Sequence, residues 1–209
     1  MADAENANAE AEEEQSPGPA ATDQSSLTLM VARDVGLAAA LLSLFAAADA
    51  WHLLTGSGLS GALSILDGLI VGVGVTAFAH EWGHYTGARW SGAQVPLRPV
   101  KSFPQVFDFD YQGCEPSHFM GLSVGGNVAH WVMVLVLAVL LPLDTVGQAA
   151  LLSGSVGFAV FGSTVEFPVI SRARSGASPL ESLSVIPKNF LQKNGAMGAA
   201  AALLVFLVL

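Results

Sequence analysis

Four long apolar stretches determine most of what this chain can fold into. They lie at about residues 35–54, 62–88, 122–143 and 149–170. Each has the roughly 20 residues that a helix needs to cross the hydrocarbon core of a bilayer. A fifth stretch, 195–209, is shorter, so it either spans, with residues 192–194 among the headgroups, or lies half-inserted. We therefore expect an all-α polytopic membrane protein with about five transmembrane helices.

The composition agrees with a membrane protein. Apolar residues make up 52% of the chain and charged residues only 12%, well under the quarter or so that is usual for soluble domains. The net charge of −9 suggests an acidic soluble protein, but much of the acid lies in the first thirty residues. That region has too little large apolar surface to offset the entropy of ordering. We expect residues 1–30 to be a disordered acidic tail and residues 31–209 to form the membrane domain.

The basic residues predict an orientation. In a five-helix arrangement they all fall on one side of the membrane: Arg33, Arg89, Arg98, Lys101, Arg172, Arg174, Lys188 and Lys193. The connections on the other side, 55–61 and 144–148, carry no base. Because basic loops stay on the cytoplasmic side, we expect an integral protein of a bacterial plasma membrane with its N-terminus in the cytoplasm.

The connection at residues 89–121 differs from the others. It contains Pro96, Pro99 and Pro104, followed by an alternation of apolar and polar residues at 106–111. This pattern predicts a short strand or hairpin, and an ordinary amphipathic cytosolic loop is the alternative. Because the segment follows the second apolar stretch directly, it could border a site at that end of the helix.

A metal-binding pattern, His80-Glu81-Trp82-Gly83-His84, ends the second apolar stretch. Residues four apart lie on one face of a helix, so both histidines can aim ring nitrogens at a common point, with Glu81 beside them. Zn²⁺ accepts such nitrogens and lowers the pKa of a bound water, whose proton Glu81 can take. Ionisable groups in an apolar segment are costly without a partner, which favours a metal site over a polar patch near the headgroups. The only cysteine is Cys114, so the third ligand must be a histidine or a carboxylate.

Residues of the later apolar stretches complete the candidate site. Glu166 lies toward the same membrane side as the motif and is our candidate for the third zinc ligand. Alternatively, it reaches the interface or pairs with Arg172 or Arg174. His130 is an alternative ligand or a hydrogen-bond partner of a ligand. Asn127 shares a helical face with His130 and could hold a substrate carbonyl, orient a ligand or make an interhelical hydrogen bond.

These residues resemble the intramembrane zinc metalloproteases of the site-2 protease type. The run from Thr76 to Tyr85 is similar to the zinc helix of that family, and Gly125-Gly126-Asn127 is similar to its Gly-Pro-x-x-Asn opening of the next core helix. The acidic ligand of the family is usually an Asp in an Asn-Pro…Asp-Gly setting. This chain lacks that Asp-Gly, and its nearest equivalent is the segment 163–168 around Glu166. The resemblance covers about residues 62–175.

The resemblance implies hydrolysis of a peptide bond in or near a transmembrane segment of another membrane protein, with Zn²⁺ as cofactor and Glu81 as general base. It also implies that substrate docks as an added strand beside residues 96–111. The missing Asp-Gly supports an alternative function, a non-catalytic zinc-binding membrane protein such as an inactive protease, a sensor or a transporter. The expected partners are the lipid bilayer and a membrane-protein substrate, with no nucleic acid. The oligomeric state stays open.

Overall fold

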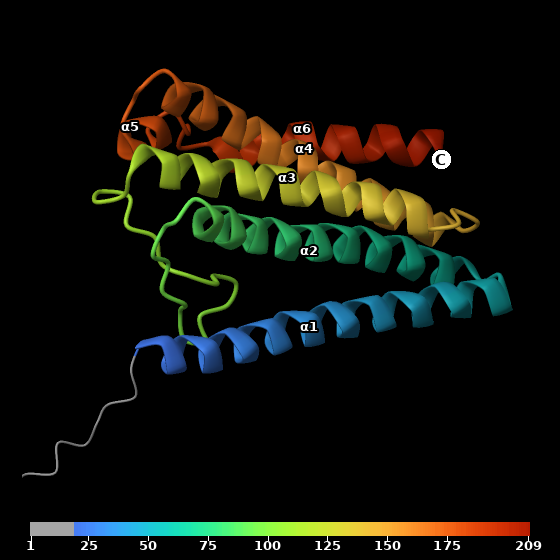
Figure 1. The fold of residues 1–209 in the computed structure, drawn as a ribbon. Coiled ribbons are helices and arrows are strands. Elements are labelled where there is room, and N and C mark those ends of the chain that lie inside the picture. Colours follow the sequence, from blue (N-terminus) through green and yellow to red (C-terminus); the bar gives the residue numbers. More distant parts are fainter. Residues whose placement is uncertain (1–18) are drawn as a thin grey trace, which may run out of the picture.

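The computed structural model describes residues 19–209, with side chains from residue 27 onward, and its regular elements there are all helices. They are α1 (Pro19–Thr55), α2 (Gly58–Trp90), α3 (Pro116–Leu140), α4 (Val146–Arg174), α5 (Pro179–Leu183) and α6 (Phe190–Val208), shown in Figure 1. All except the short α5 are long and apolar enough to cross a membrane. The predicted all-α polytopic architecture with five transmembrane helices is confirmed.

All five long helices begin before the apolar stretches that predict them, and the difference matters most for α1 and α6. Helix α1 starts at Pro19, within the segment 1–30 that was expected to be a disordered tail. Leu27, Leu29 and Met30 extend the apolar run of this helix before residue 35, and Met30 is completely buried. The remainder of the predicted tail, residues 1–18, lies outside the described residues. Helix α6 already starts at Phe190, and its 19 residues are enough for a span.

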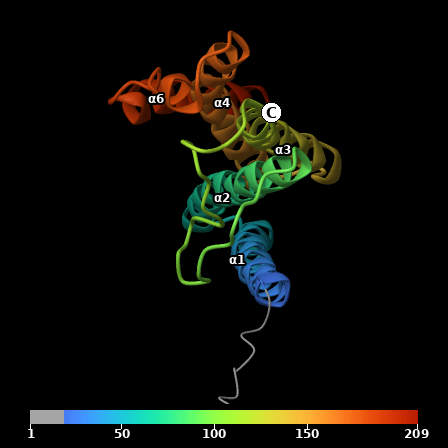
Figure 2. The same cartoon turned by 60° about the vertical axis from the view of Figure 1, so that its left-hand side comes forward.

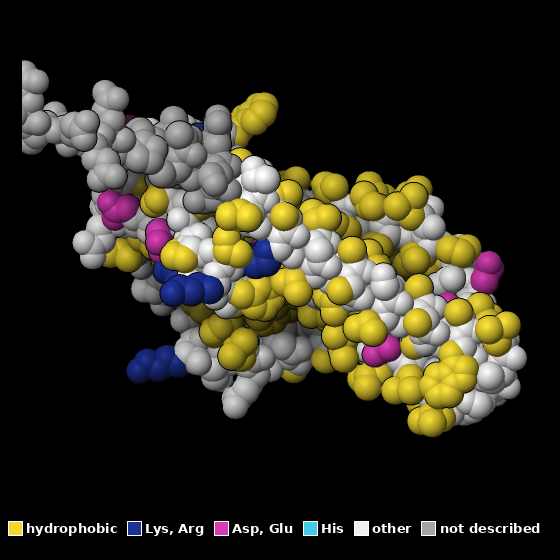
Figure 3. Space-filling view, turned by 90° about the horizontal axis from the view of Figure 1, so that it is seen from below, with side chains coloured by type: hydrophobic (Ala, Val, Ile, Leu, Met, Phe, Trp, Pro, Cys, Tyr) yellow, Lys and Arg dark blue, Asp and Glu magenta, His cyan; other side chains and the backbone are white. Residues whose placement is uncertain are grey.

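The bundle is organised around α2, which packs against α1, α3 and α4, while α6 packs against α4 (Figures 1 and 2). The helix directions place the start of α1, the ends of α2 and α4, and the start of α6 at one end of the bundle (Figure 1). The basic residues belong to these segments and their connections. On the face shown in Figure 3, the Lys and Arg side chains lie near that end, and hydrophobic side chains cover much of the remaining surface.

The connection between α2 and α3, residues 91–115, forms a hairpin-like turn and no regular strand. One antiparallel bridge pairs Leu97 with Phe107, and backbone hydrogen bonds of 3.0 Å flank it on both sides. The prolines of this segment lack an N–H donor, which prevents a longer ladder. The predicted strand is therefore reduced to a single bridge.

Glycines bring α2 and α3 into backbone contact beside the motif. Gly83 and Gly87 of α2 face Gly121 and Gly125 of α3. A Cβ atom added at any of the four would overlap a backbone carbonyl oxygen of the opposite helix. Two small-xxx-small pairs of this kind allow membrane helices to approach closely. This contact holds α3 against the part of α2 that carries the motif.

We expect the substitution Gly87→Ala to destabilise the bundle. The added methyl group would meet the Gly121 carbonyl, which can move away only if α2 and α3 separate. Overpacking of this kind costs about 1–3 kcal/mol, measurable as a lower unfolding midpoint in a denaturant titration in detergent micelles. Gly36→Ala is the matched control, because nothing lies within 4 Å of a Cβ atom at Gly36. Equal losses in both variants would contradict a tight α2–α3 contact.

A partly buried ion pair within α1 contacts both the motif helix and the 91–115 connection. The Nε atom of Arg33 lies 2.7 Å from Oδ1 of Asp34, and Nε1 of Trp82 donates to Oδ2 of Asp34 at 2.9 Å. Arg33 also donates to the carbonyl of Val100 at 2.8 Å and lies 5.5 Å from the ring centroid of Phe103. Trp82, inside the metal-binding motif, is thus hydrogen-bonded to α1, and α1 contacts the 91–115 connection through Arg33.

Candidate metal centre

Helices α2 and α4 bring the three predicted ligands together. The Nε2 atoms of His80 and His84 lie 3.0 Å apart. Oε1 of Glu166 lies 3.5 Å from Nε2 of His80 and 3.0 Å from Nε2 of His84. Zinc–nitrogen bonds of about 2.0–2.1 Å at tetrahedral angles place ligand atoms about 3.3 Å apart. The three side chains therefore have a spacing that could hold a zinc ion and leave a fourth position open.

The alternative contacts of Glu166 are not formed. Among the described residues, Glu166 makes no ion pair with Arg172 or Arg174. Its carboxylate instead points to the two histidines, and its second oxygen, Oε2, accepts a hydrogen bond from Nδ2 of Asn127 at 2.9 Å. This contact is an interhelical hydrogen bond from α3 to α4, and it agrees with a role of Asn127 in orienting the Glu166 carboxylate.

The second ring nitrogen of His84 has a partner that determines its protonation. Nδ1 of His84 lies 2.8 Å from the backbone carbonyl of Leu122 on α3. A carbonyl oxygen only accepts hydrogen bonds, so Nδ1 carries a proton, and in the neutral ring Nε2 then has a free lone pair. This is the arrangement that a metal-ligating histidine requires.

His130 lies behind His80 and not at the point where the three ligands meet. It is completely buried, and its Nδ1 atom lies 3.1 Å from Nδ1 of His80. Its Nε2 atom lies 3.2 Å from Oγ of Ser163. Of the two roles open to His130, its contacts match a hydrogen-bond partner of a ligand.

Ser163 is a site residue that sequence reasoning missed. Its Oγ atom accepts a hydrogen bond from Nε1 of Trp131 at 2.9 Å and lies 3.3 Å from Oδ1 of Asn127. Serines are frequent along α4, so its residue type carries no signal. Its position three residues before Glu166, on the same face of the helix, is the one feature that could have identified it.

Glu81 opens onto a cavity of about 390 Å³ with polar and apolar walls. His84 and Glu166 line the same cavity, and so do residues of the 91–115 connection, among them Arg98, Phe107, Asp108 and Tyr111. The expectation that this connection borders the site agrees with this arrangement. Glu81 makes no side-chain hydrogen bond with any described residue, so its carboxylate is available to a water molecule or a substrate.

Tyr111 is a second residue whose place in the site was missed. Burial, reinforced by the negative charge of Glu81, raises the pKa of the Tyr111 phenol. The phenol therefore stays protonated at neutral pH and is a hydrogen-bond donor in the cavity. Its position depends on how the 91–115 connection folds back over the end of α2, and no local pattern predicts that path.

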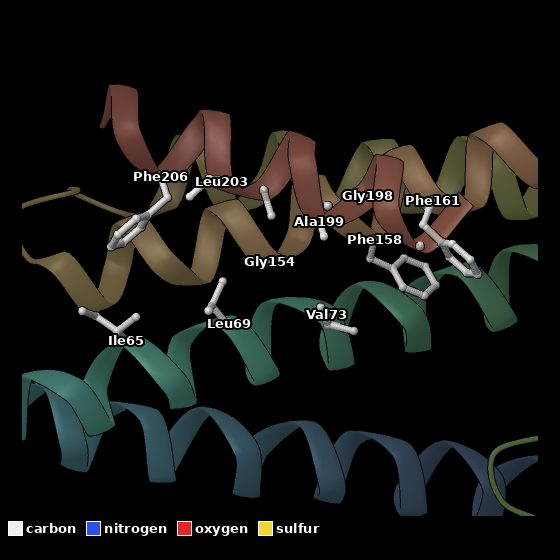
Figure 4. A pocket seen from close by; sticks show the side chains of 13 residues that line it. Ile65, Leu69, Val73, Gly154, Phe158, Phe161, Gly198, Ala199, Leu203 and Phe206 are labelled. Atoms are coloured by element: carbon white, nitrogen blue, oxygen red, sulfur yellow. The ribbon is translucent and has the colours of Figure 1, made fainter. Parts of the chain in front are cut away.

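An apolar groove borders the other side of the site (Figure 4). It has a volume of about 650 Å³ and lies between α2, α4 and α6. Figure 4 shows Leu69 and Val73 of α2 facing residues of α4 and α6, including Phe158 and Leu203. The ring of Phe158 also meets the ring of His80 edge-on, with centroids 5.5 Å apart. The groove therefore reaches the candidate ligands through this ring.

Comparisons of the chain with family models, with curated proteins and with solved structures found no match in any of the three. The likeness to the site-2 protease type is therefore carried by the motif residues alone. What the site can do follows from its own geometry and chemistry.

Proposed function

We propose that this protein is an intramembrane zinc metalloendopeptidase that hydrolyses a peptide bond in or near a transmembrane segment of another membrane protein. The observation that carries the proposal is the convergence of His80, His84 and Glu166, whose ligand atoms lie 3.0–3.5 Å apart inside a helix bundle. Electron-pair donors this close repel one another unless a proton or a cation lies between them. Zn²⁺, when bound, supplies a Lewis acid that polarises a peptide carbonyl and acidifies a water molecule.

The side chains around the metal centre supply the remaining chemistry. Glu81, whose carboxylate is free, takes the proton of the attacking water and later passes it to the leaving amine. The protonated phenol of Tyr111 donates a hydrogen bond to the substrate carbonyl oxygen as negative charge develops on it. Both groups line the cavity, which brings water to a depth where hydrocarbon would exclude it.

The groove between α2, α4 and α6 supports a transmembrane segment as the substrate. Its lining is almost entirely apolar, which suits the apolar side chains of a transmembrane segment. The substrate must lose helical structure near the site before its backbone can be attacked. An extended stretch can then pair with backbone groups near Leu97 and Phe107.

The proposal includes an orientation in the membrane. The end of the bundle that carries the bases faces the cytoplasm of a bacterial plasma membrane, and the N-terminus lies on that side. The cavity at Glu81 adjoins the 91–115 connection at the same end. Water and the cleaved peptide thus exchange with the cytoplasm.

Zinc content and cleavage together test this function. Protein purified in detergent is expected to bind about one equivalent of zinc, measured by elemental mass spectrometry. Reconstituted in vesicles with a mixed panel of labelled single-pass transmembrane peptides, it is expected to release fragments that mass spectrometry assigns to defined bonds. Zinc binding without cleavage of any peptide would favour the non-catalytic zinc-binding protein, which the missing Asp-Gly motif supports. A protein that binds no zinc would exclude both functions.

A further inference from the structure

Ser163 contacts three side chains of α3 with one hydroxyl group. Its Oγ atom lies 2.9 Å from Nε1 of Trp131, 3.2 Å from Nε2 of His130 and 3.3 Å from Oδ1 of Asn127. Ser163 is only 5% exposed, so water does not compete for these contacts. A hydroxyl has one proton and two lone pairs, and the three contacts therefore use its full capacity.

The chemistry of the partners allows only one direction for each hydrogen bond. The indole N–H of Trp131 can only donate, so it takes one lone pair of Ser163. The amide nitrogen of Asn127 donates to the carboxylate of Glu166, so the amide oxygen faces Ser163 and receives its proton. The remaining contact, with Nε2 of His130, must then be a hydrogen bond from His130 to the second lone pair of Ser163.

The direction of the hydrogen bond from His130 to Ser163 also determines which ring nitrogen of His80 carries the proton. A neutral histidine has one ring proton, and in His130 that proton lies on Nε2. The Nδ1 atom of His130 is therefore an acceptor, and Nδ1 of His80, 3.1 Å away, must donate to it. His80 is left with a free lone pair on Nε2, the atom that faces His84 and Glu166.

We propose that Ser163 is a positioning residue that sets the tautomer of His80 through His130 and the orientation of the Glu166 carboxylate through Asn127. One hydroxyl group thereby presents two of the three ligands to the metal. The third ligand, His84, is set independently by the carbonyl of Leu122. This role rests on the metal centre proposed above and deepens it, because hydrogen-bond partners of ligands typically change metal affinity about 10–100-fold.

The variant Ser163→Ala tests this role, with Ser155→Ala as its matched control. Ser155 is also on α4 and completely buried, and its hydroxyl bonds to Oγ1 of Thr76 on α2 at 2.7 Å, away from the ligands. Ser163→Ala removes three interhelical hydrogen bonds and Ser155→Ala removes one, so both are expected to lower the unfolding midpoint, Ser163→Ala by more. Zinc affinity, measured by competition with a chromophoric chelator, is expected to fall about 10–100-fold in Ser163→Ala and to stay near the wild-type value in Ser155→Ala.

Nitrogen NMR of protein with ¹⁵N-labelled histidines separates positioning from packing. Above the titration range of histidine, we expect His130 to carry its proton on Nε2 in the wild type, with or without zinc. In Ser163→Ala we expect a mixture of both tautomers, and in Ser155→Ala no change. A wild-type His130 protonated on Nδ1, or equal zinc affinities of the two variants, would overturn the role of Ser163. If the wild type binds no zinc while the His130 tautomer still depends on Ser163, the proposed enzyme function fails and the hydrogen-bond chain is supported.

Discussion

Glu81→Gln is expected to lower peptide cleavage by about 10²–10⁴-fold, the usual contribution of a general base, and to leave zinc bound. Glutamine has nearly the same shape as glutamate but cannot accept the proton of the attacking water. Zinc binding is expected to persist because the converging ligand atoms belong to His80, His84 and Glu166. Cleavage of the transmembrane peptide panel and zinc content should be measured on the same preparation.

Glu115→Gln is the matched control for this substitution. Its side chain is 75% exposed and forms an ion pair with His118 at 3.9 Å, and neither residue lines the cavity. It is expected to cleave at the wild-type rate. If Glu81→Gln binds zinc and also cleaves at the wild-type rate, Glu81 is not the base, and a different residue must accept the proton.

Glu166→Ala is expected to lower zinc affinity by more than about 100-fold, beyond the loss of a hydrogen-bond partner of a ligand. The substitution removes the oxygen that lies 3.0 Å and 3.5 Å from the two histidine nitrogens. It also leaves the amide of Asn127 without its acceptor. Competition with a chromophoric chelator measures the change, and Glu115→Ala is the control. An unchanged affinity in Glu166→Ala would show that the third ligand is a different residue.

Glu166→Asp sharpens the same test. Aspartate retains the charge but is shorter by one carbon–carbon bond, about 1.5 Å. We expect zinc affinity between those of the wild type and Glu166→Ala, because the carboxylate falls short unless α4 moves toward α2. Full recovery with aspartate would mean that the helices adjust to the shorter ligand.

The parts of the site that depend on spacing within one helix could be predicted from the sequence. The helix repeat alone places His80 and His84 on one face with Glu81 beside them. The lengths of the apolar runs likewise predict four of the spans, whereas the fifth run was too short to choose between a span and a half-inserted segment. The depth of Glu166 was predictable because basic residues follow both helix ends on one side of the membrane.

The contacts between helices could not be predicted. Ser163 and Trp131 are 32 residues apart, and their contact depends on how α3 and α4 are rotated against each other. For the same reason, the role of Asn127 stayed open among three possibilities until Glu166 was seen beside it. The position of Tyr111 at the cavity depends on the path of an irregular connection, which the sequence does not predict. The burial of Met30 likewise depends on contacts of α1 with other parts of the chain.

The glycine contact between α2 and α3 has a mechanical consequence. No side chains separate the two backbones at Gly83, Gly87, Gly121 and Gly125, so no rotamer change can open a gap there. Helices α2 and α3 thus move as one rigid body that carries His84 together with the Leu122 carbonyl that holds its ring. Of the three candidate ligands, the two histidines belong to this rigid body, whereas Glu166 belongs to α4 and changes its distance to them only if α4 moves.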